Sequence, residues 1–289
     1  MSKKPVEKKE VETTGHEWDG IQEFNNPLPR WWVWVFYATI VWGIWYTIAY
    51  PAWPLIKGAT AGYLGYSTRA EVADEIKRYE VLNEAINTEL ASADLAQIQP
   101  GTELYSYARE SGRATFVTWC SQCHGEGANG ISEASGYPNL LDDDWLWGGE
   151  IDVIQTTIAH GIRDESDDDT RLNDMPAHDE LLEPQEIDDV VDYVFALSGG
   201  EADPAKVEAG AVVFEDNCSS CHGEGGVGDR ELGGPNLADA IWLYGGDKET
   251  IRASVENGRK GVMPAWTAKL TQAQINGVAL YVHQLGGGE

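Results

Sequence analysis

The sequence predicts a mainly α-helical chain in which one N-terminal transmembrane helix precedes two small helical domains in tandem. Three observations lead to this prediction: an uncharged, aromatic-rich stretch near the N-terminus, a cysteine motif that occurs twice, and a repeat that relates the two halves of the remaining chain. At 289 residues, the chain is long enough for about two ordinary domains besides such a helix.

Residues 31–56 contain no charged side chain and are long enough to cross a bilayer as a helix. Tryptophans crowd the start of this stretch, and Tyr50 and Trp53 mark its far end, as expected for aromatic belts at the two membrane interfaces. Pro51 and Pro54 are expected to end or kink the helix. A cleaved signal peptide is the alternative, although its apolar core would be shorter and would start closer to the N-terminus.

Basic residues are concentrated before the anchor and are sparse after it until Arg69, and this asymmetry predicts a cytoplasmic N-terminus. The chain after the anchor is then expected in the periplasm, with a single pass through the inner membrane of a bacterial cell. The basic residues before the anchor are Lys3, Lys4, Lys8, Lys9 and Arg30.

The formal net charge is −28, from 48 Asp and Glu against 20 Lys and Arg. Such a surface excludes nucleic-acid binding through phosphate contacts. It favours a basic partner protein, whose encounter with this chain would be accelerated at low salt. Adaptation to a salty habitat would explain the same charge.

All four cysteines belong to two Cys-x-x-Cys-His motifs, a spacing typical of covalent c-type haem attachment, so we expect two covalently bound haem c groups. The adjacent histidine would bind the iron. A zinc site would need four ligands, whereas each motif supplies three and the two are nearly a hundred residues apart. A thioredoxin-like motif would need a strand-to-helix setting, and two disulfides would leave the histidines unexplained. The predicted attachment residues are Cys120, Cys123, His124, Cys218, Cys221 and His222.

The chain contains an internal repeat, because residues 116–199 resemble residues 214–287. The offset is 97 between Pro138 and Pro235 but 88 between the methionines that follow, so the first copy carries nine extra residues, placed in an acidic loop at 163–169. The predicted organisation is a cytoplasmic segment (1–30), the anchor (31–56), a periplasmic linker with a helix (57–100), and two class I cytochrome c-like domains (101–200 and 201–289).

Apolar residues at helical spacing predict a helix over 183–197 in the first repeat and over 271–285 in the second. Shorter helices are expected ahead of each cysteine motif, over 102–118 and 204–216, with a domain boundary between the repeats near Gly199 to Pro204. In the linker, residues 71–95 carry a broken apolar stripe that indicates a helix. This helix would dock onto a partner subunit or pack on the chain's own haem domains.

Met175 and Met263 occupy equivalent places in the two repeats, each followed by Pro and Ala. This register predicts that they are the sixth iron ligands, because a thioether opposite histidine raises the reduction potential, as in electron-carrying cytochromes c. Two strong axial ligands leave no open position on iron, which favours electron transfer over the binding of oxygen or peroxide. His160 or His178 as the sixth ligand of the first haem is the alternative.

The prolines of the repeated Pro-Asn-Leu step are expected to offer their carbonyls to the iron-binding histidines. Such a bond from the ring N–H would fix the orientation and basicity of each imidazole. The aromatic residues of the following loops would shield the porphyrins, although ordinary core packing explains them equally well. These aromatic residues are Trp145, Trp147, Trp242 and Tyr244.

Residues 15–21 (Gly-His-Glu-Trp-Asp-Gly-Ile) and 26–32 (Asn-Pro-Leu-Pro-Arg-Trp-Trp) precede and enter the anchor. Together with one anchor and two tandem haem motifs, they resemble the diheme subunit (subunit III, the CcoP/FixP family) of cbb3-type cytochrome c oxidase. The resemblance implies that the chain takes electrons from a donor cytochrome c and passes them toward the catalytic haem–copper subunit through a monohaem cytochrome c subunit. It implies no catalytic residue in this chain, which would serve an oxidoreductase complex as its electron-transfer subunit.

The resemblance also implies an exchange of ligands, with Met263 completing the first haem and Met175 the second. The simplest interpretation of the repeats gives each methionine to its own haem, and sequence spacing does not decide between the two. A free-standing membrane-anchored diheme carrier is one alternative function. A diheme peroxidase is another, but it would need a haem with an open distal side, and the symmetric methionines argue against that.

Charge indicates where a donor would dock. Residues 101–200 hold 22 Asp and Glu against 4 Arg, a net −18, whereas residues 201–289 hold 13 against 7 basic residues, a net −6. The first haem domain is therefore the expected docking site for a basic cytochrome c. The acidic run Asp167-Asp168-Asp169 is expected to take part.

Overall fold

The computed structural model describes residues 12–130 and 135–288. It divides into two compact units, Met1–Leu82 and Asn83–Glu289. Lys3, Lys4, Lys8 and Lys9, on which the predicted topology partly rests, lie outside the described residues.

The first unit begins with an antiparallel hairpin of β1 (Thr13–Trp18) and β2 (Ile21–Phe24). Asp19 and Gly20 form its turn with φ values of 49° and 82°. An Asp-Gly pair suits such a turn because both central residues must adopt positive φ. The sequence analysis did not predict this hairpin, although the Asp-Gly dipeptide was the signal that could have found it.

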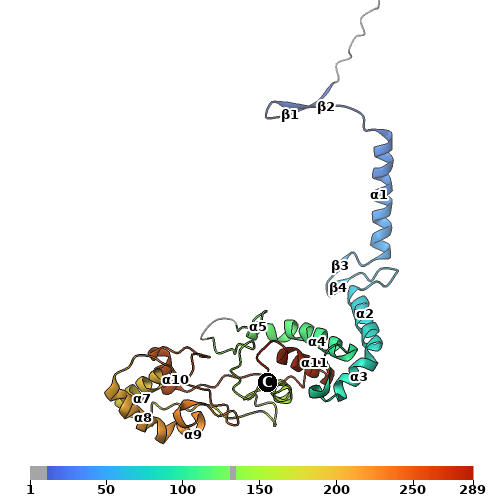
Figure 1. Ribbon diagram of the computed structural model, residues 1–289. Helices are drawn as coiled ribbons and strands as arrows, with labels where there is room; N and C mark the ends of the chain where they lie inside the picture. The colour runs from blue at the N-terminus through green and yellow to red at the C-terminus, as the bar shows by residue number, and fades with distance from the viewer. Residues whose placement is uncertain (1–11, 131–134, 289) are drawn as a thin grey trace, which may run out of the picture. The chain divides into compact units, whose positions relative to one another are not determined.

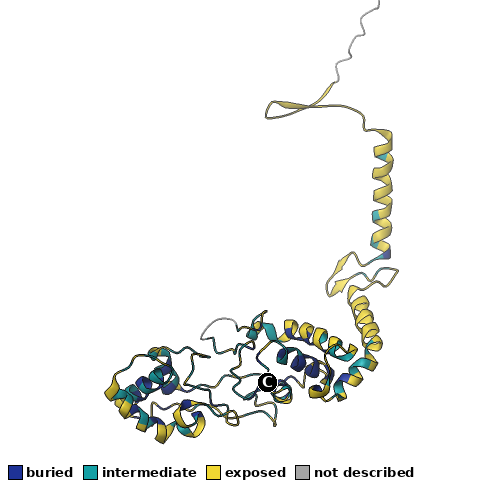
Figure 2. Ribbon diagram, in the orientation of Figure 1, coloured by how far each residue is buried: buried dark blue, intermediate teal, exposed yellow. Residues whose placement is uncertain are grey.

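The helix α1, which corresponds to the predicted anchor, runs over Arg30–Ala49 and is apolar and long enough to cross a membrane. Nearly all of it is exposed, as Figure 2 shows by colour. The predicted range of 31–56 was too long at its end, because Tyr50 is extended with ψ 162°. A residue before proline avoids the α region, so the helix ends ahead of Pro51. The chain continues as a short hairpin, β3 (Pro54–Leu55) and β4 (Gly58–Ala59).

The helix predicted over 71–95 is two helices, α2 (Thr68–Leu82) and α3 (Glu84–Ser92). The break lies at Asn83, whose φ of −99° and ψ of 4° are not helical. Leu90 of α3 is fully buried in the core of its own unit, so this half packs on the chain itself. No residue of α2 is buried. Its large apolar side chains are all at least half exposed, namely Val72, Ile76, Tyr79, Val81 and Leu82.

The second unit contains two hydrophobic cores, each built around one cysteine motif. We call residues 83–172 and 263–289 the first lobe, and residues 173–262 the second lobe. The first lobe contains α3, η1 (Leu95–Gln97), α4 (Glu103–Thr115), the π-helical turn η2 (Phe116–Cys120), α5 (Ser121–His124), α6 (Ile151–His160) and α11 (Gln272–His283). The second contains α7 (Pro184–Leu197), α8 (Pro204–Asn217), α9 (Ser219–His222), η3 (Glu224–Gly226) and α10 (Lys248–Asn257).

The lobes do not coincide with the two sequence repeats, because the last helix of each repeat packs in the other lobe. The helix α11 of the second repeat packs against α4 and α6, whereas α7 of the first repeat packs against α8 and α10. In Figure 1, α4 and α11 lie together although they are far apart in sequence. We expected consecutive packed domains over 101–200 and 201–289. Instead, the predicted boundary at 199–204 is only the connection between α7 and α8 inside the second lobe.

The predicted helices of the repeats are present. The helix predicted over 183–197 is α7, and the one predicted over 271–285 is α11, which ends two residues earlier. Both open with a capping box, in which the first residue and a Glu or Gln three residues later satisfy each other's backbone N–H groups. The sequence analysis did not predict α6 and α10, which lie between the haem motif and the methionine of each repeat.

The helices α4 and α11 of the first lobe cross closely at Gly112. A Cβ atom at this residue would lie 2.0 Å from the carbonyl oxygen of Gly277 in α11. We therefore expect Gly112→Ala to reduce the free energy of unfolding of the first lobe by about 1 to 3 kcal/mol, as overpacking does elsewhere. Denaturant unfolding of the full chain would measure this. Ser106→Ala, an exposed change on the same helix, should have little effect, and equal stability of the two variants would contradict the prediction.

Candidate haem-binding sites

Each motif histidine is held by the carbonyl that the sequence analysis expected. The Nδ1 atom of His124 lies 3.2 Å from the carbonyl oxygen of Pro138, and Nδ1 of His222 lies 3.1 Å from that of Pro235. Because a carbonyl only accepts, Nδ1 must carry the proton and donate it. Each imidazole therefore keeps Nε2 unprotonated and available to bind an iron.

Burial lowers the pKa of both His124 and His222, and the bond to the proline carbonyl opposes this effect without cancelling it. In His222 the neighbouring His178 lowers the pKa further. Both rings are consequently neutral at pH 7. Neutral imidazole is the form that binds metal, so the two sites present their histidines ready for ligation.

The four cysteines are free thiols, which does not favour the disulfide alternative. Burial, followed by the charge of the second cysteine of the motif, raises the pKa of Cys120 and of Cys218 to about 11. These side chains are therefore neutral thiols at physiological pH. Each motif supplies two thiols and one histidine, one ligand fewer than a structural zinc site needs, whereas addition of S–H across a vinyl group forms the thioether of haem c. The chemistry of the donor set fits haem better than zinc.

Met175 and Met263 each form a reciprocal pair of backbone hydrogen bonds with a residue of the other repeat. Ile162 N–H donates to the Met263 carbonyl at 2.8 Å, and Met263 N–H donates back at 3.0 Å. Met175 and Arg259 exchange equivalent bonds, both at 3.1 Å. Met263 packs against the first-lobe core together with Cys120, and Met175 packs against the second-lobe core together with Cys218. The fold thus brings each methionine to the cysteine motif of the opposite repeat.

A glycine makes each of these crossings possible. Gly161 and Gly258 end α6 and α10 with φ of 68° and 69°, in the left-handed region that favours glycine. A Cβ atom at Gly161 would lie 2.3 Å from the Met263 carbonyl oxygen, and one at Gly258 would lie 2.3 Å from that of Met175. The two methionine segments pass so close to the helix ends that no larger residue fits.

The aromatic loops also cross between the repeats. The Trp147 ring lies where a Cβ atom of Gly233 would be, and the Tyr244 ring stands in the same relation to Gly136. An arginine lies over each ring, with the Arg171 guanidinium 5.1 Å from the Trp147 centroid and that of Arg259 4.2 Å from the Tyr244 centroid. These are cation–π distances. The sequence analysis missed both arginines. Each stands four residues before its Met-Pro-Ala, and this regularity could have identified them.

Trp147 supports the fit of a haem by another observation. Its Nε1 atom is buried and has no hydrogen-bond partner among the described residues. A buried N–H group without an acceptor is costly, and a haem carries carboxylates that can accept such a bond. With two histidine Nε2 atoms, four thiols and two methionines gathered in two places, the residues present fit two haem groups.

The two other histidines weighed as iron ligands have different surroundings. His160 Nδ1 lies 3.0 Å from an Asp167 carboxylate oxygen, so the acidic insertion folds back onto the end of α6. Asp164 of the same insertion accepts a hydrogen bond from the Ala265 backbone N–H at 2.7 Å. His178 is buried in the second lobe, where its backbone N–H donates to Val255. His178 also contributes to the lowered pKa of His222, so it lies near the second cysteine motif.

Asp144 is a half-buried carboxyl in a cleft that it shares with Asp239 of the second repeat. Burial, then the charges of Asp239 and Asp142, raise its pKa from 3.8 to about 6. Because the folded pKa exceeds the unfolded one, ionisation opposes folding. The penalty grows as pH rises from about 4 to 6 and is complete above that range.

We expect Asp144→Asn to stabilise the chain at pH 7.5. A shift of one pKa unit corresponds to about 1.4 kcal/mol. Because solvent screens this half-exposed group, we expect the free energy of unfolding to rise by only about 1 kcal/mol. Thermal unfolding at pH 7.5 and pH 5 would measure it, with a smaller gain at pH 5. Asp143→Asn, at the exposed neighbour, is the matched control. A gain that does not depend on pH would contradict the assignment.

Comparison with known proteins agrees with this geometry. Residues 10–57 match the family described as the N-terminal domain of cytochrome oxidase-cbb3, FixP, and residues 108–194 and 205–282 match Cytochrome C oxidase, cbb3-type, subunit III. The Cbb3-type cytochrome c oxidase subunit CcoP of Rhodobacter capsulatus is 56% identical over 300 residues, covering all of both chains. That of Cereibacter sphaeroides is 54% identical, again over both full lengths.

A more distant relative is the Cbb3-type cytochrome c oxidase subunit FixP of Azorhizobium caulinodans, which is 50% identical over 96% of this chain and 94% of its own length. The matched regions include the hairpin, the anchor and both cysteine motifs. The chain therefore belongs to the CcoP/FixP family, subunit III of cbb3-type cytochrome c oxidase.

Proposed function

We propose that this chain carries two covalently bound haem c groups and passes electrons from a donor cytochrome c toward the catalytic subunit of a cbb3-type oxidase. The observation that carries the proposal is the assembly of two similar sites. Each has two thiols, a histidine held by a proline carbonyl, and a methionine in the same core. A haem held by histidine and methionine supplies one-electron chemistry at a raised potential.

The proposed axial ligands are His124 with Met263 in the first lobe and His222 with Met175 in the second. The backbone pairing of each methionine with the opposite repeat supports this exchange. The chain's own contribution is to orient and shield. The carbonyls of Pro138 and Pro235 fix the histidine rings. A haem iron held by one histidine and one methionine would carry electrons without binding oxygen or peroxide.

The proposed location is the bacterial inner membrane, with α1 as the single span, the N-terminus in the cytoplasm and both lobes in the periplasm. The length and exposure of α1 support a span. The excess of basic residues before it supports the orientation. This orientation places the thiols where c-type haem is attached in bacteria.

The proposed partners are the catalytic haem–copper subunit and the monohaem cytochrome c subunit of the oxidase, with a basic cytochrome c as donor. Membership of the oxidase family supports assembly with other oxidase subunits. The exposed apolar residues of α2 offer one surface for that assembly. The net charge of −28 supports a basic donor.

Purification from native membranes in mild detergent tests the proposal. We expect two haem c per chain that resist acid–acetone extraction, together with haem b and copper from the catalytic subunit. A Cys218→Ala/Cys221→Ala variant should retain one haem c per chain. Purification of the chain without haem b and copper would favour a free-standing carrier, and peroxide turnover by the isolated chain would favour a peroxidase. Either result would contradict the proposed role.

A further inference from the structure

The helices α7 and α11 share most of their apolar core positions but differ in charge. Aligning Tyr193 with Tyr281 matches Ile187, Val190 and Val194 of α7 with Ile275, Val278 and Val282 of α11. In the same alignment, Asp188 of α7 corresponds to Asn276 of α11. Likewise, Asp192 corresponds to Leu280. The two helices therefore fill the same kind of groove but present different polar groups to it.

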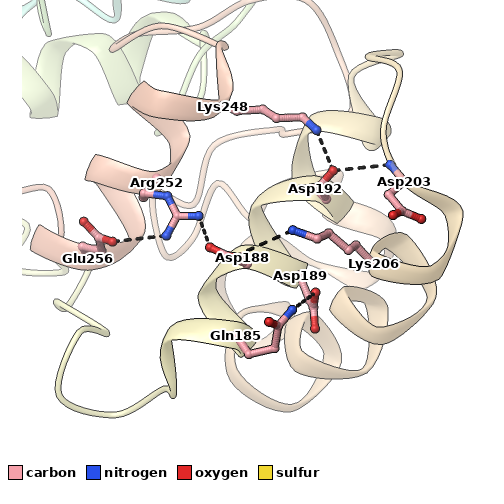
Figure 3. Close-up of polar contacts among 9 residues, drawn as sticks. All are labelled: Gln185, Asp188, Asp189, Asp192, Asp203, Lys206, Lys248, Arg252 and Glu256. Atoms are coloured by element: carbon pink, nitrogen blue, oxygen red, sulfur yellow. Dashed lines mark hydrogen bonds and ion pairs between the residues drawn. The ribbon is translucent and has the colours of Figure 1, made fainter.

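In the second lobe, the acidic residues of α7 meet basic residues of the second repeat (Figure 3). Asp192 is only 7% exposed, and it accepts a hydrogen bond from Lys248 Nζ at 2.5 Å. Asp188 is paired with Arg252 of α10, and Lys206 of α8 lies 3.8 Å from the same carboxylate. A buried carboxylate is tolerated where a base neutralises it, and Lys248 does this for Asp192.

In the first lobe, the corresponding positions are neutral. The sequences of α6 and α10 align through Gly161 and Gly258, which places Gln155 at the position of Arg252. Gln155 Nε2 donates to Asn276 Oδ1 at 2.6 Å, so an amide pair replaces the ion pair.

The position of Lys248 is likewise occupied by an uncharged residue in the first lobe. Ile151 of α6 corresponds to Lys248, and it packs against the core that contains Leu280, which is 3% exposed. On α4, Ala108 corresponds to Lys206 and is fully buried. The first lobe thus offers apolar and amide groups at the three positions where the second offers cations.

Returning each helix to its own repeat would break every one of these matches. Asp192 would enter the apolar site beside Ile151, and Leu280 would replace the carboxylate that neutralises Lys248 in the present arrangement. The carboxylate of Asp188 would face an amide. A buried carboxylate without a base is strongly unfavourable, whereas one with a base is tolerated. The two connectivities bury the same repeated apolar residues but differ strongly in the surroundings of the carboxylates.

We propose that these residues form a pairing code that directs each C-terminal helix, and the methionine that precedes it, to the haem motif of the opposite repeat. The code consists of Asp188 and Asp192 with Arg252 and Lys248 in the second lobe, and of Asn276 and Leu280 with Gln155 and Ile151 in the first. They are positioning residues, because they act on the iron through the methionine segments. The consequence for the haems rests on the proposed methionine ligation, whereas the helix pairing does not.

Transferring the code tests the proposal. The variant Asp188→Asn/Asp192→Leu/Asn276→Asp/Leu280→Asp moves the acidic residues from α7 to α11 and leaves all partner positions unchanged. A protease site is inserted in the full-length holoprotein within the connection 199–203, in which Gly199, Glu201 and Asp203 are exposed. After cleavage of the native sequence, the two fragments should stay together, because each lobe contains helices of both. After cleavage of the variant, each repeat should fold on itself.

The readout is the amount of N-terminal fragment recovered with a tag on the C-terminus after cleavage in detergent. We expect recovery to fall at least tenfold in the transfer variant. The near-infrared methionine-to-iron band should persist, because each methionine would then reach the haem of its own repeat. Native-like recovery would overturn the code. Loss of the methionine band in the uncleaved native protein would instead overturn the ligation, so the two failures are distinguishable.

A second pair of variants keeps the proposal testable if the transfer variant does not fold. Asp192→Leu/Lys248→Ile copies the first-lobe pair into the second lobe. The helices α7 and α11 would then no longer be distinguished at this position, so recovery of the N-terminal fragment should fall. Asp192→Lys/Lys248→Asp reverses the charges and should restore it. Arg109→Gln/Glu110→Gln removes an ion pair within α4 alone and is the matched control. Equal recovery in all three variants would overturn the proposal.

Discussion

Replacing Met263 by leucine is expected to lower the reduction potential of the haem proposed at Cys120 and Cys123, although Met263 lies in the second repeat. Leucine keeps the volume and removes the thioether, and the methionine ligand raises the potential of a histidine-ligated haem. Axial ligands set haem potentials over a range of about 0.8 V, so a fall on the order of 0.1 V or more is expected. Potentiometric titration would measure the change.

The two haems must be told apart for this prediction to discriminate. In a Cys218→Ala/Cys221→Ala background, only the first haem remains. There Met263→Leu should lower the potential, and Met175→Leu should leave it nearly unchanged. In the reciprocal Cys120→Ala/Cys123→Ala background, the two effects should change places. If the potential fell instead when the methionine of the same repeat was changed, each haem would be ligated by the methionine of its own repeat. That result would contradict the packing of both cores.

Much of each site could be predicted from the sequence because its parts are local. The Cys-x-x-Cys-His spacing and the Pro-Asn-Leu step determined which carbonyl meets which histidine, and both contacts are present. The limits of α7 and α11 followed from capping residues and from apolar spacing. Such signals lie within one turn or one helix, so they do not depend on how distant parts of the chain pack.

The exchange of helices could not be predicted in this way because the hydrophobic pattern is the same for both connectivities. Ile187 and Ile275 occupy equivalent core positions, so these apolar residues do not distinguish one groove from the other. The difference lies in partners that are distant in sequence, such as Asp192 and Lys248. The helices α6 and α10 were missed for a related reason. Each is only ten residues long, which is too short for a clear helical period, and α10 also carries few apolar side chains.

Folding also changes the charge argument about donor docking. The sequence repeats differ strongly in net charge, but the lobes do not, because α7 and its acidic residues belong to the second lobe. The first lobe holds 18 Asp and Glu against 5 Lys and Arg, a net −13, and the second holds 20 against 6, a net −14. Net charge therefore does not favour either lobe. The acidic insertion remains the local feature that distinguishes the first.

Within that insertion, the residues to change are Asp168 and Asp169. Both are exposed, whereas Asp167 is bound to His160 and has a structural role. We expect Asp168→Asn/Asp169→Asn to slow the reaction with a reduced, basic soluble cytochrome c by about 2- to 10-fold at low ionic strength, because complementary charge accelerates encounter. The difference should vanish near 1 M salt, where the screening length is about 3 Å. Stopped-flow oxidation of the donor would give the second-order rate constant.

The matched control moves the same loss of charge to the second lobe. Glu208 and Glu215 are exposed on α8, and Glu208→Gln/Glu215→Gln removes two negative charges without touching the insertion. If the donor docks at the insertion, this control should change the rate constant much less than the insertion variant does. Equal slowing by both variants would mean that the donor responds only to overall charge. If only the control variant lowered the rate constant, electrons would enter at the second lobe. The haem proposed to be held by His222 and Met175 would then be the first acceptor.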